Sequence, residues 1–370
     1  MPRLRRSDLT RPGITRRHVG PGSQDWEYDG PDGRVLTDPA TVERCRALVL
    51  PPAWSDVWIS PWPNGHVQAV GTDVKGRRQY RYHEAWTAQQ AERKFDHVLE
   101  VATALWRIRA GVQADLALPG MPRERALACA VRLLEVGFFR IGSEEYTEAN
   151  GSFGLATLRK DHVELETEAV LFDYIAKSGK QRHRTIPDPA VRACVQELLA
   201  RDDEANPELL AWYDEAADRW VDVKSADIND HLRLLVGRDV SAKDFRTWAA
   251  TMLCAVALAV STGVADSPTA RRRAITRAVA ETAHHLGNTP AVCRASYIHP
   301  RLFDLYADGI TVVDALDAVG DTAAPGDLAY HGAVEAAVLG MLREEPAAAS
   351  RRQTKARARA GGQPPQVAAA

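Results

Sequence analysis

The spacing of hydrophobic positions divides the chain into a short part that alternates and a longer part with helical periodicity. Between residues 26 and 82, apolar and polar residues alternate in short runs separated by Gly, Pro, Asn and Asp, which is typical of strands joined by turns. After Glu84, apolar positions recur every three or four residues, as in residues 95–105, which predicts helices. We therefore expect an α+β protein, with a small N-terminal β-rich domain over residues 21–84 and a larger, mainly α-helical domain over residues 85–346.

The same pattern predicts the individual elements. In the N-terminal part, strands are expected at residues 26–28, 57–59, 67–70 and 79–82, and a helix at residues 39–48. In the longer part, helices are expected at residues 95–105 and 123–136, and then from residue 187 almost to Pro346. One β-hairpin excursion interrupts these helices, with strands at residues 163–165 and 170–175, a turn at residues 177–180 and a return towards Ile186.

Both ends of the chain are basic and lack apolar periodicity. Six arginines face a single acidic residue, Asp8, within residues 1–20. Residues 347–370 combine Arg and Lys with Ala, Gly, Gln and Pro, a composition that cannot bury enough apolar surface to order itself. We expect a flexible basic arm at residues 1–20 and a disordered basic tail at residues 347–370.

The composition is that of an average soluble globular protein, with 45% hydrophobic and 26% charged residues. Lys and Arg number 47 and Asp and Glu 49, so the overall charge indicates no class of partner, and an electrostatic argument needs local clusters. The five cysteines show no C-x-x-C spacing, which indicates reduced thiols in a cytoplasmic protein. The longest apolar run, residues 248–260, is too short to span a membrane, and no secretory signal follows the first arginines.

A turn followed by a strand gathers cations and aromatic side chains, namely Lys75, Arg77, Arg78, Tyr80 and Tyr82. Lys and Arg neutralise phosphates and release counterions, and tyrosines pack on sugars or stack on bases. The same residues are typical of a solvated edge strand that is protected by charges. Composition alone leaves both interpretations open.

Two further cations stand at unusual positions. Arg140 follows the apolar end of a predicted helix, where a cation either pairs with Glu144 or Glu145 or has a function. The glycine-rich residues 151–154 nearby lack the pattern G-x-G-x-x-G, so a dinucleotide site is not expected. Lys177 lies in a tight hairpin turn that is not a P-loop, where a lysine is either solvated or able to deliver a proton into a groove.

A predicted helix start carries another pair of cations. Ser241 is expected to be the N-cap of a helix whose first turn contains Lys243 and Arg246, three residues apart near the positive end of the helix dipole. Such a pair forms a natural anion cradle. The alternative is that Arg246 pairs with Asp244 or with a more distant carboxylate.

A second helix start is predicted at Thr289, because Pro290 follows as the first helical residue. Tyr297 falls near the end of this short helix, just before Pro300 breaks it. A tyrosine at such a position is usually a hydrogen-bonded packing residue.

The sequence contains no cluster with metal-ligand spacing. His284 and His285 are adjacent and so point to different sides of a helix, and neither H-E-x-x-H nor a paired-carboxylate motif is present. We expect no metal and no cofactor. A phosphoryl-transfer site in this chain would have to use arginines and lysines in place of Mg²⁺.

Taken together and in this order, the motifs resemble those of type IB DNA topoisomerases of the compact bacterial and poxvirus branch. The resemblance covers about residues 26–346. Its five stretches are KGRRQY at 75–80, RIG at 140–142 with GLATL at 154–158, Lys177, KDFRT at 243–247, and GNTP at 287–290 with SY at 296–297. Each motif alone is weak, whereas five in this order at compatible separations are a strong signal.

The resemblance implies a role for each candidate residue. Tyr297 is the implied nucleophile, and Arg140 and Arg246 are implied to bind the scissile phosphate. Lys177 is the implied general acid for the leaving 5′ oxygen, with Lys243 as a second cation beside it.

Two positions distinguish the branches of the family that the chain resembles. Asn288 stands at the fourth phosphate-contacting position, where the poxvirus enzymes have His and the bacterial branch has Asn. An asparagine can donate a neutral hydrogen bond but cannot shuttle protons. Ser178 stands where the poxvirus pattern has an acidic residue, so the sequence names no acidic partner for Lys177.

The implied activity is that of an isomerase that relaxes positive and negative supercoils without ATP or metal. One strand is cleaved through a 3′-phosphotyrosyl intermediate, the duplex rotates, and the strand is religated. The implied architecture is a clamp around duplex DNA, whose β-rich domain binds DNA through the five residues of the cation and tyrosine segment. The implied protein is a monomer in the cytoplasm, associated with the nucleoid, with no membrane partner and no small-molecule substrate.

Two other functions fit parts of the pattern. A tyrosine recombinase shares the Arg, Lys, Arg and Tyr chemistry, but it usually has His-x-x-Arg where this chain has residues 243–246, and it lacks the β-rich domain. A non-catalytic duplex-binding protein would use the same basic patches and leave Tyr297 as a packing residue. A metal-dependent phosphodiesterase is disfavoured, because the sequence lacks a carboxylate or histidine cluster.

Overall fold

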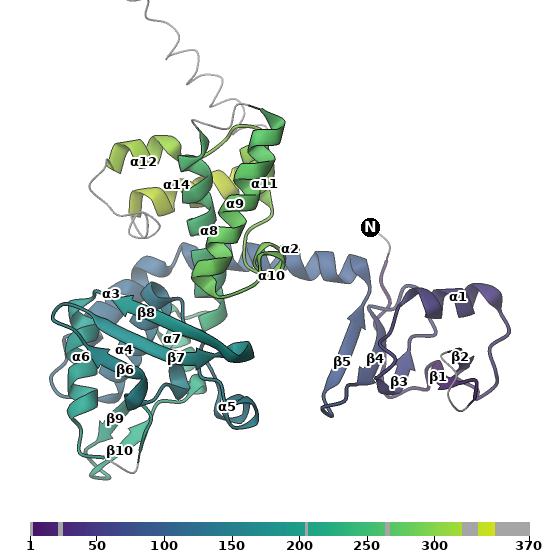
Figure 1. Cartoon of the computed structure of the whole chain (residues 1–370), viewed down its shortest axis with the longest axis horizontal. Coiled ribbons are helices and arrows are strands. Elements are labelled where there is room, and N and C mark those ends of the chain that lie inside the picture. Colours follow the sequence, from purple (N-terminus) through teal and green to yellow (C-terminus); the bar gives the residue numbers. More distant parts are fainter. Residues whose placement is uncertain (1–2, 21–24, 204–205, 263–266, 320–331, 345–370) are drawn as a thin grey trace, which may run out of the picture. The chain divides into compact units, whose positions relative to one another are not determined.

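The computed structural model describes residues 3–20, 25–203, 206–262, 267–319 and 332–344. These residues form two compact units, which divide after Asp96 within helix α2 (Glu84–Ala102) (Figure 1). The first unit is rich in strands, whereas the second is larger and mainly helical with short sheets of its own. The chain therefore has the mixed α and β character that its hydrophobic pattern predicts.

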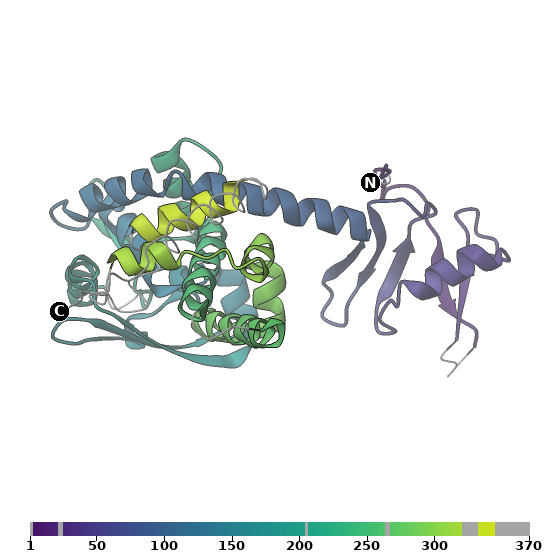
Figure 2. The same ribbon diagram turned by 90° about the horizontal axis from the view of Figure 1, so that it is seen from above.

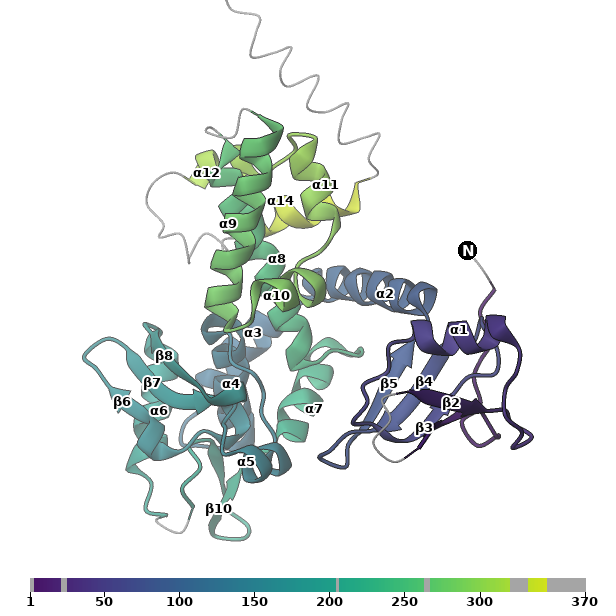
Figure 3. The ribbon, with the colours of Figure 1, turned by 45° about the vertical axis from the view of Figure 1, so that its right-hand side comes forward.

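The first unit consists of two small antiparallel sheets and a helix. Its elements before α2 are β1 (Thr15–His18), β2 (Trp26–Asp29), α1 (Pro39–Ala47), β3 (Ser55–Ile59), β4 (Val67–Thr72) and β5 (Arg78–Tyr82). Strand β1 pairs with β2, and β3, β4 and β5 form a meander in sequence order. Figure 3 shows α1 alongside these strands, and Cys45 of α1 is buried in one cluster with Ile59 and Ala69. The strands and the helix expected in this part are confirmed.

The expectation of a flexible arm at residues 1–20 is wrong for the part that the structure describes. The Arg5 amide donates to the Asn64 carbonyl at 2.9 Å, and the His66 amide donates to the Arg5 carbonyl at 2.9 Å. Further along, Ile14 is buried and pairs with Ile59, and β1 follows directly. Backbone pairing orders this segment, which a count of its charges and apolar residues does not detect.

The second unit contains helices α3 to α14 and two further small sheets. Its helices are α3 (Leu105–Leu116), α4 (Arg123–Gly137), α5 (Glu144–Asn150), α6 (Pro189–Ala200), α7 (Ser225–Val236), α8 (Ala242–Val260), α9 (Pro268–Leu286), α10 (Pro290–Ser296), α11 (Arg301–Ala307), α12 (Val313–Val319) and α14 (Gly332–Arg343). Its strands are β6 (Val163–Leu165), β7 (Val170–Ala176), β8 (Lys180–Ile186), β9 (Ala211–Asp214) and β10 (Arg219–Asp222). Short 3₁₀ turns lie at Leu155–Thr157, Lys160–His162 and Lys177–Gly179.

The core of the second unit is organised around α4 and α8. Most residues of both helices are buried, and α4 contacts α3, α6, α7, α8 and strand β8. Strands β6, β7 and β8 form an antiparallel sheet in sequence order, and Figure 2 shows the long β7–β8 hairpin running along one edge of this unit. Phe139, directly after α4, packs edge-on against Phe172 of β7. The hairpin is thereby held against the helical core.

Several helices begin with the same local device, a capping side chain followed by proline. Asp188 accepts from the amides of Ala190 and Val191 at the start of α6, and Thr289 accepts from the Val292 amide at the start of α10. Proline suits the first helical position because that residue needs no amide donor. The expected starts of α8 after Ser241 and of α10 after Thr289 are confirmed.

Two expectations for the helical part need correction. The helix expected through residue 105 ends at Ala102, and Leu105 begins a new one. The Thr103 hydroxyl donates to the Glu100 carbonyl at 2.6 Å, a bond by which a threonine competes with the helical ladder. The second correction is the hairpin of β9 and β10, where only helices were expected. Asp214 accepts from two amides in its turn. The expected basic tail at residues 347–370 lies outside the described residues.

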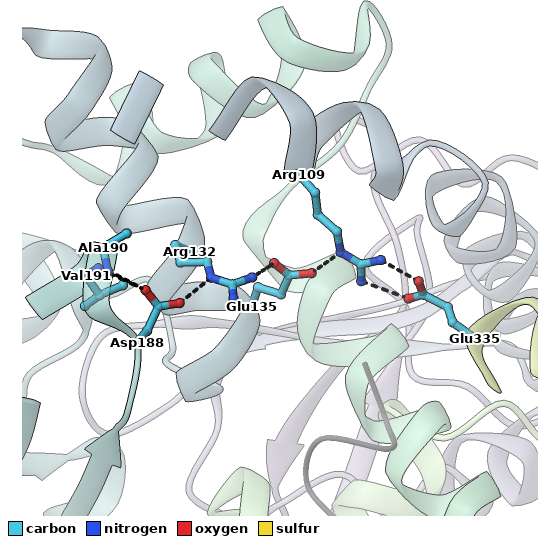
Figure 4. A network of polar contacts seen from close by, with 7 residues as sticks. All are labelled: Arg109, Arg132, Glu135, Asp188, Ala190, Val191 and Glu335. Atoms are coloured by element: carbon cyan, nitrogen blue, oxygen red, sulfur yellow. Dashed lines mark hydrogen bonds and ion pairs between the residues drawn. The ribbon is translucent and has the colours of Figure 1, made fainter. Parts of the chain in front are cut away.

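A chain of ion pairs crosses the second unit and joins elements that are far apart in the sequence (Figure 4). Arg109 of α3 donates to Glu135 of α4 at 2.6 Å and to Glu335 of α14 at 2.6 and 3.1 Å. Arg132 continues the chain from Glu135 to Asp188, at 3.0 and 2.7 Å. Charged groups this close to the core are tolerated only when they are paired and hydrogen-bonded. Arg109 therefore ties α14 to the centre of the unit.

We expect Arg109→Ala to lower the free energy of unfolding by roughly 3–5 kcal/mol, because it removes the ion-pair partner of the largely buried Glu335 and one of the partners of the largely buried Glu135. The measurement is urea unfolding followed by circular dichroism. The control is Arg233→Ala, which removes an exposed pair with Asp230 in α7 and should change stability little. A loss for Arg109→Ala no larger than that of the control contradicts the structural role of the network.

Candidate active site

The carboxyl end of α9 is surrounded by arginines from three other segments. Arg182 of β8 donates to the His284 carbonyl at 3.4 Å and to the His285 carbonyl at 2.8 Å. Arg184 of β8 donates to the same His285 carbonyl. The next two carbonyls along the chain, at residues 286 and 287, accept from Arg246 at 2.8 Å and from Arg140 at 3.2 Å. The last carbonyls of a helix lack intrahelical donors and carry its negative dipole end, so cations stabilise them.

Asn288 lies between two of these guanidinium groups. Its Oδ1 accepts a hydrogen bond from Arg140 at 2.6 Å and another from Arg246 at 3.3 Å. Its backbone amide donates back to the Ala283 carbonyl at 2.9 Å, while Gly287 turns the chain with φ +68°. That left-handed conformation favours glycine. The turn therefore fixes the amide that holds Arg140 and Arg246 together.

Arg246 is the most buried cation of the group. It is 4% exposed, and it also donates to the Phe138 carbonyl directly after α4. Burial, together with the nearby charge of Arg140, lowers the pKa of Arg246 to about 10. Its Nε atom is buried and has no hydrogen-bond partner in the described part of the chain. A guanidinium in these surroundings is stabilised by an anion, which would supply both the missing acceptor and a compensating charge.

Tyr297 directly follows α10 and lies next to Arg246. The guanidinium carbon of Arg246 is 5.6 Å from the centre of the Tyr297 ring. The Thr251 hydroxyl of α8 donates to the Tyr297 carbonyl at 3.3 Å and accepts from the His299 amide at 3.1 Å. The same helix therefore carries Arg246 and fixes the backbone on both sides of the phenol.

The alternative partners considered for these arginines are not the observed ones. Glu144 pairs with Lys224, and Arg140 instead donates to the turn after α9. Asp244 accepts from the Ser241 amide at 2.8 Å and lies 3.5 Å from His97. Neither arginine forms an ion pair with a carboxylate of the described residues within 4.0 Å. Their positive charge is uncompensated by the protein itself.

The two candidate lysines are exposed and stand apart from the arginine cluster. Lys177 lies in the turn between β7 and β8, with its Nζ 5.3 Å from the centre of the Tyr146 ring. Lys243 lies in the first turn of α8. Among the described residues, no hydrogen bond joins either side chain to Arg140, Arg246 or Tyr297. The sequence named no acidic partner for Lys177, and among the described residues no carboxylate forms an ion pair with it: Asp173 on the same hairpin faces His183 at 3.3 Å.

The candidate DNA-binding residues of the first unit occupy the β4–β5 turn and strand β5. Lys75 and Arg78 are exposed. Tyr80 and Tyr82 are 42% and 43% exposed and stack on each other, with ring centres 5.9 Å apart. Arg77 is engaged within the turn, because its guanidinium donates to Asp73 at 2.7 and 2.9 Å. These bonds from Arg77 and the turn amides lower the pKa of Asp73 to about 2.

Sequence reasoning missed Arg182 and Arg184 as part of the site. The signal was present, because the strand KQRHRTI places its two arginines two residues apart and therefore on one face. Tyr174, opposite Arg182 in the sheet, was missed as well. Its phenol is buried, which raises its pKa, and Arg182 and Arg184 oppose that shift. The partners of this face are carbonyls of a distant helix end, which no local pattern reveals.

Two further features of the described residues bear on the kind of site. No three His, Cys, Asp or Glu side chains there lie close enough together to hold a metal ion. None of the helices in the described ranges has both the length and the apolar character that crossing a membrane requires.

Comparison with known proteins places the chain in a family. The family model for the catalytic core of eukaryotic DNA topoisomerase I matches residues 81–315, and the model for the N-terminal domain of bacterial DNA topoisomerase IB matches residues 25–73. The DNA topoisomerase 1B of Acanthamoeba polyphaga mimivirus is 27% identical over 296 residues, which cover 80% of this chain and 87% of the viral one. The DNA topoisomerase 1B of vaccinia virus is 20% identical over 239 residues, covering 65% and 72%.

The two family models together account for both compact units, and the larger match alone covers more than half of the chain. The protein therefore belongs to the type IB DNA topoisomerase family. The resemblance noted in the five sequence motifs is confirmed. Its viral relatives are of the compact kind that the motifs indicated.

The geometry around Asn288 gives a test that does not depend on catalysis. Asn288→Asp would keep the shape and both hydrogen bonds while placing a negative charge between two guanidiniums. We expect the free energy of unfolding to rise by about 1–2 kcal/mol, because both bonds become charge-assisted. Urea unfolding measures the change, with Asn288→Ala as the comparison that removes both bonds. A less stable Asp variant contradicts the observed placement of Asn288.

Proposed function

We propose that this protein relaxes supercoiled duplex DNA by transient cleavage of one strand, with Tyr297 as the nucleophile. The scissile phosphate binds to Arg140, Arg246 and Asn288. Family membership supports the reaction class, and the duplex is the substrate of the family. The proposal assigns the individual residues and needs neither ATP nor a bound metal ion.

The observation that carries this proposal is the pair of uncompensated guanidiniums held on one amide, next to a tyrosine. Arg140 and Arg246 share the Oδ1 of Asn288, and the ring of Tyr297 lies 5.6 Å from Arg246. Two fixed guanidiniums can bind the non-bridging oxygens of a phosphodiester and remain charged at any working pH. They stabilise the extra negative charge that develops on those oxygens in the transition state. The arrangement is suited to phosphoryl transfer to the phenol.

In the proposed step, the Tyr297 oxygen forms a bond to the phosphorus while the bond to the 5′ oxygen breaks. The tyrosine gives its proton to solvent water, and the leaving 5′ oxygen gains one from Lys177. Cations beside the attacking oxygen stabilise the negative charge that develops on it. The product is a phosphotyrosyl bond at the 3′ end. Religation is the reverse displacement, in which the 5′ hydroxyl attacks phosphorus and releases the phenol.

The two lysines are assigned on different grounds from the arginines. Lys177 is proposed as the general acid because it directly follows β7, whose hairpin with β8 is fixed to the site through Arg182. Its present position over Tyr146 is one that bound DNA must change. Lys243 is proposed as a second cation at the amino-terminal end of α8, where backbone amides also favour a phosphate.

The first unit is proposed to bind the duplex through β5 and the turn before it. Lys75 and Arg78 would contact phosphates, while the stacked Tyr80 and Tyr82 offer exposed ring faces to sugars or bases. Arg77 would contribute less, since Asp73 already neutralises it. We also propose that the two units close as a clamp around the DNA, and that the protein acts as a monomer in association with the nucleoid in the cytoplasm.

The direct test uses supercoiled plasmid in EDTA and without ATP. We expect the wild-type protein to relax it in single topoisomer steps and to form a covalent adduct with the 3′ end when denatured by detergent. Tyr297→Phe should form no adduct, because the attacking oxygen is absent, while binding to duplex in a gel-shift assay stays nearly intact. Binding without adduct in the wild type contradicts the proposal, and strand exchange between specific sites would indicate a recombinase.

The proposed duplex contacts are tested by the salt dependence of binding. Each lost phosphate contact lowers the slope of log K against log salt by about 0.9, so Lys75→Ala/Arg78→Ala should lower it by roughly 2. The assay is fluorescence anisotropy with a labelled duplex in the Tyr297→Phe background. Arg34→Ala is the control, because this exposed arginine faces Asp32 in another turn of the same unit. An unchanged slope in the double variant places the DNA elsewhere.

A further inference from the structure

The β7–β8 hairpin contacts the catalytic turn through a residue that the proposed chemistry does not use. Arg182 donates to the carbonyls of His284 and His285, directly before the turn that presents Asn288. Its guanidinium also packs on Gly287: a Cβ atom added there would lie 2.6 Å from the guanidinium carbon of Arg182. Arg182 therefore touches the backbone of this turn at His284, His285 and Gly287.

We propose that Arg182 is a positioning residue for Asn288, and through it for the two arginines that bind the scissile phosphate. This inference rests on the proposed function of that site. Arg182 itself does not touch the reacting atoms. Arg182 fixes the end of α9 from strand β8. Arg140, which follows α4, and Arg246 of α8 bond to the same turn.

The argument begins with the orphan carbonyls of the helix end. Among the described residues, loss of Arg182 leaves the His284 carbonyl with only its 3.1 Å bond from the Gly287 amide, and the His285 carbonyl with only Arg184. The end of a helix with unsatisfied carbonyls frays. Because Asn288 follows immediately, fraying displaces the Oδ1 atom on which Arg140 and Arg246 converge.

The charges in this cluster explain why the positioning must be rigid. Burial, and then the charge of Arg140, lower the pKa of Arg182, which places the two guanidiniums within electrostatic reach of each other. Like charges so close separate unless fixed acceptors hold them. The carbonyls of α9 and the amide oxygen of Asn288 are those acceptors. Losing one guanidinium from this set changes the position of the others.

Arg182 could instead serve Lys177, because both belong to the same hairpin. In the sheet, Arg182 lies opposite Tyr174, and Lys180 lies opposite Ala176, directly before Lys177. The observed contacts of Arg182 favour a role in positioning Asn288. They are direct hydrogen bonds and packing on the adjacent glycine, whereas Lys177 is separated from Arg182 by the end of the hairpin. The two roles predict different responses to a change of leaving group, which the test uses.

The test measures single-turnover cleavage of a nicked duplex by excess full-length protein, with the covalent adduct as readout. We expect Arg182→Ala to slow cleavage on the order of 10²-fold, the effect of a small misplacement of catalytic groups. Duplex affinity in the Tyr297→Phe background should change little. Arg182→Lys should recover part of the rate, because a lysine can donate to one carbonyl but cannot form the fork of bonds. Unchanged cleavage by Arg182→Ala, or no recovery by Arg182→Lys, overturns the proposal.

The second arm uses a substrate whose leaving 5′ oxygen is replaced by sulfur. A thiolate leaves without a proton, since a thiol has a pKa of about 8.5. This substrate should restore cleavage by Lys177→Ala but leave Arg182→Ala slow. Restoration of Arg182→Ala overturns the assignment to Asn288 and moves Arg182 to the leaving-group side.

The matched control is Arg192→Ala. Arg192 of α6 is also half-buried and donates to a backbone carbonyl, that of Glu166 at 2.8 Å, but it lies outside the site. It should cleave at the wild-type rate, and equal slowing by both variants overturns a specific role for Arg182. Absence of adduct in the wild-type protein, by contrast, disproves the proposed function rather than this inference.

Discussion

The site depends on one interaction: the carboxyl end of α9 is stabilised by side-chain guanidiniums in place of the next turn of helix. Consecutive carbonyls from His284 to Gly287 accept from arginines that come from β8, α8 and the segment after α4. A helix end with its negative dipole and free lone pairs is the natural partner for clustered cations. The fold thereby collects four positive side chains at one helix end, two of which, Arg140 and Arg246, form no ion pair with a carboxylate of the described residues.

This solution explains how positive charge can be kept uncompensated inside a folded protein. Carboxylate partners would stabilise the free protein more, but they would also occupy the positions that a phosphate oxygen needs. Carbonyls and the amide of Asn288 supply hydrogen bonds without a compensating charge, while burial and the charge of Arg140 lower the pKa of Arg246 to about 10. Guanidiniums without carboxylate partners lower the local stability of the free protein, but they leave the site able to bind an anion. Such a compromise is common at functional sites. The ion pairs of Arg109 contribute stability elsewhere in the same unit.

The distance along the chain over which each sequence signal acts decides how much of the fold and the site could be predicted. Strand alternation, helix periodicity and the starts at Ser241 and Thr289 are local, and they were predicted with nearly the observed bounds. Arg140, Arg246 and Asn288 were proposed from five motifs that are weak alone but stand in a characteristic order, and the structure brings these three side chains together. The partners of these residues were not predictable, since their acceptors are backbone carbonyls of another element. Every residue has a backbone carbonyl, so the residue type of the partner does not reveal that a side chain bonds to it.

The errors have the same physical origin. The N-terminal arm was expected to be flexible from its charges, but its order comes from backbone pairing with residues 64–66. The β9–β10 hairpin was missed although Trp212, Tyr213, Trp220 and Val221 are typical strand residues, since the helical pattern on both sides was extended across it. In both places main-chain pairing brings together residues that no local pattern links, and it buries apolar side chains such as Ile14 and Ala211.

The anchoring of α14 has a mechanical consequence. In the proposed reaction, Tyr297 carries a DNA strand, and the rotating duplex would exert torque on that single covalent bond. The chain continues beyond that bond to α14, where Glu335 is bonded to Arg109 and to the Trp248 indole of α8. Helix α8, which carries Arg246, is therefore also bonded to a helix that follows Tyr297 in the chain. In the proposed reaction, load on the phenol would pass into α8 and, through Glu335 and Arg109, into α14 and α3.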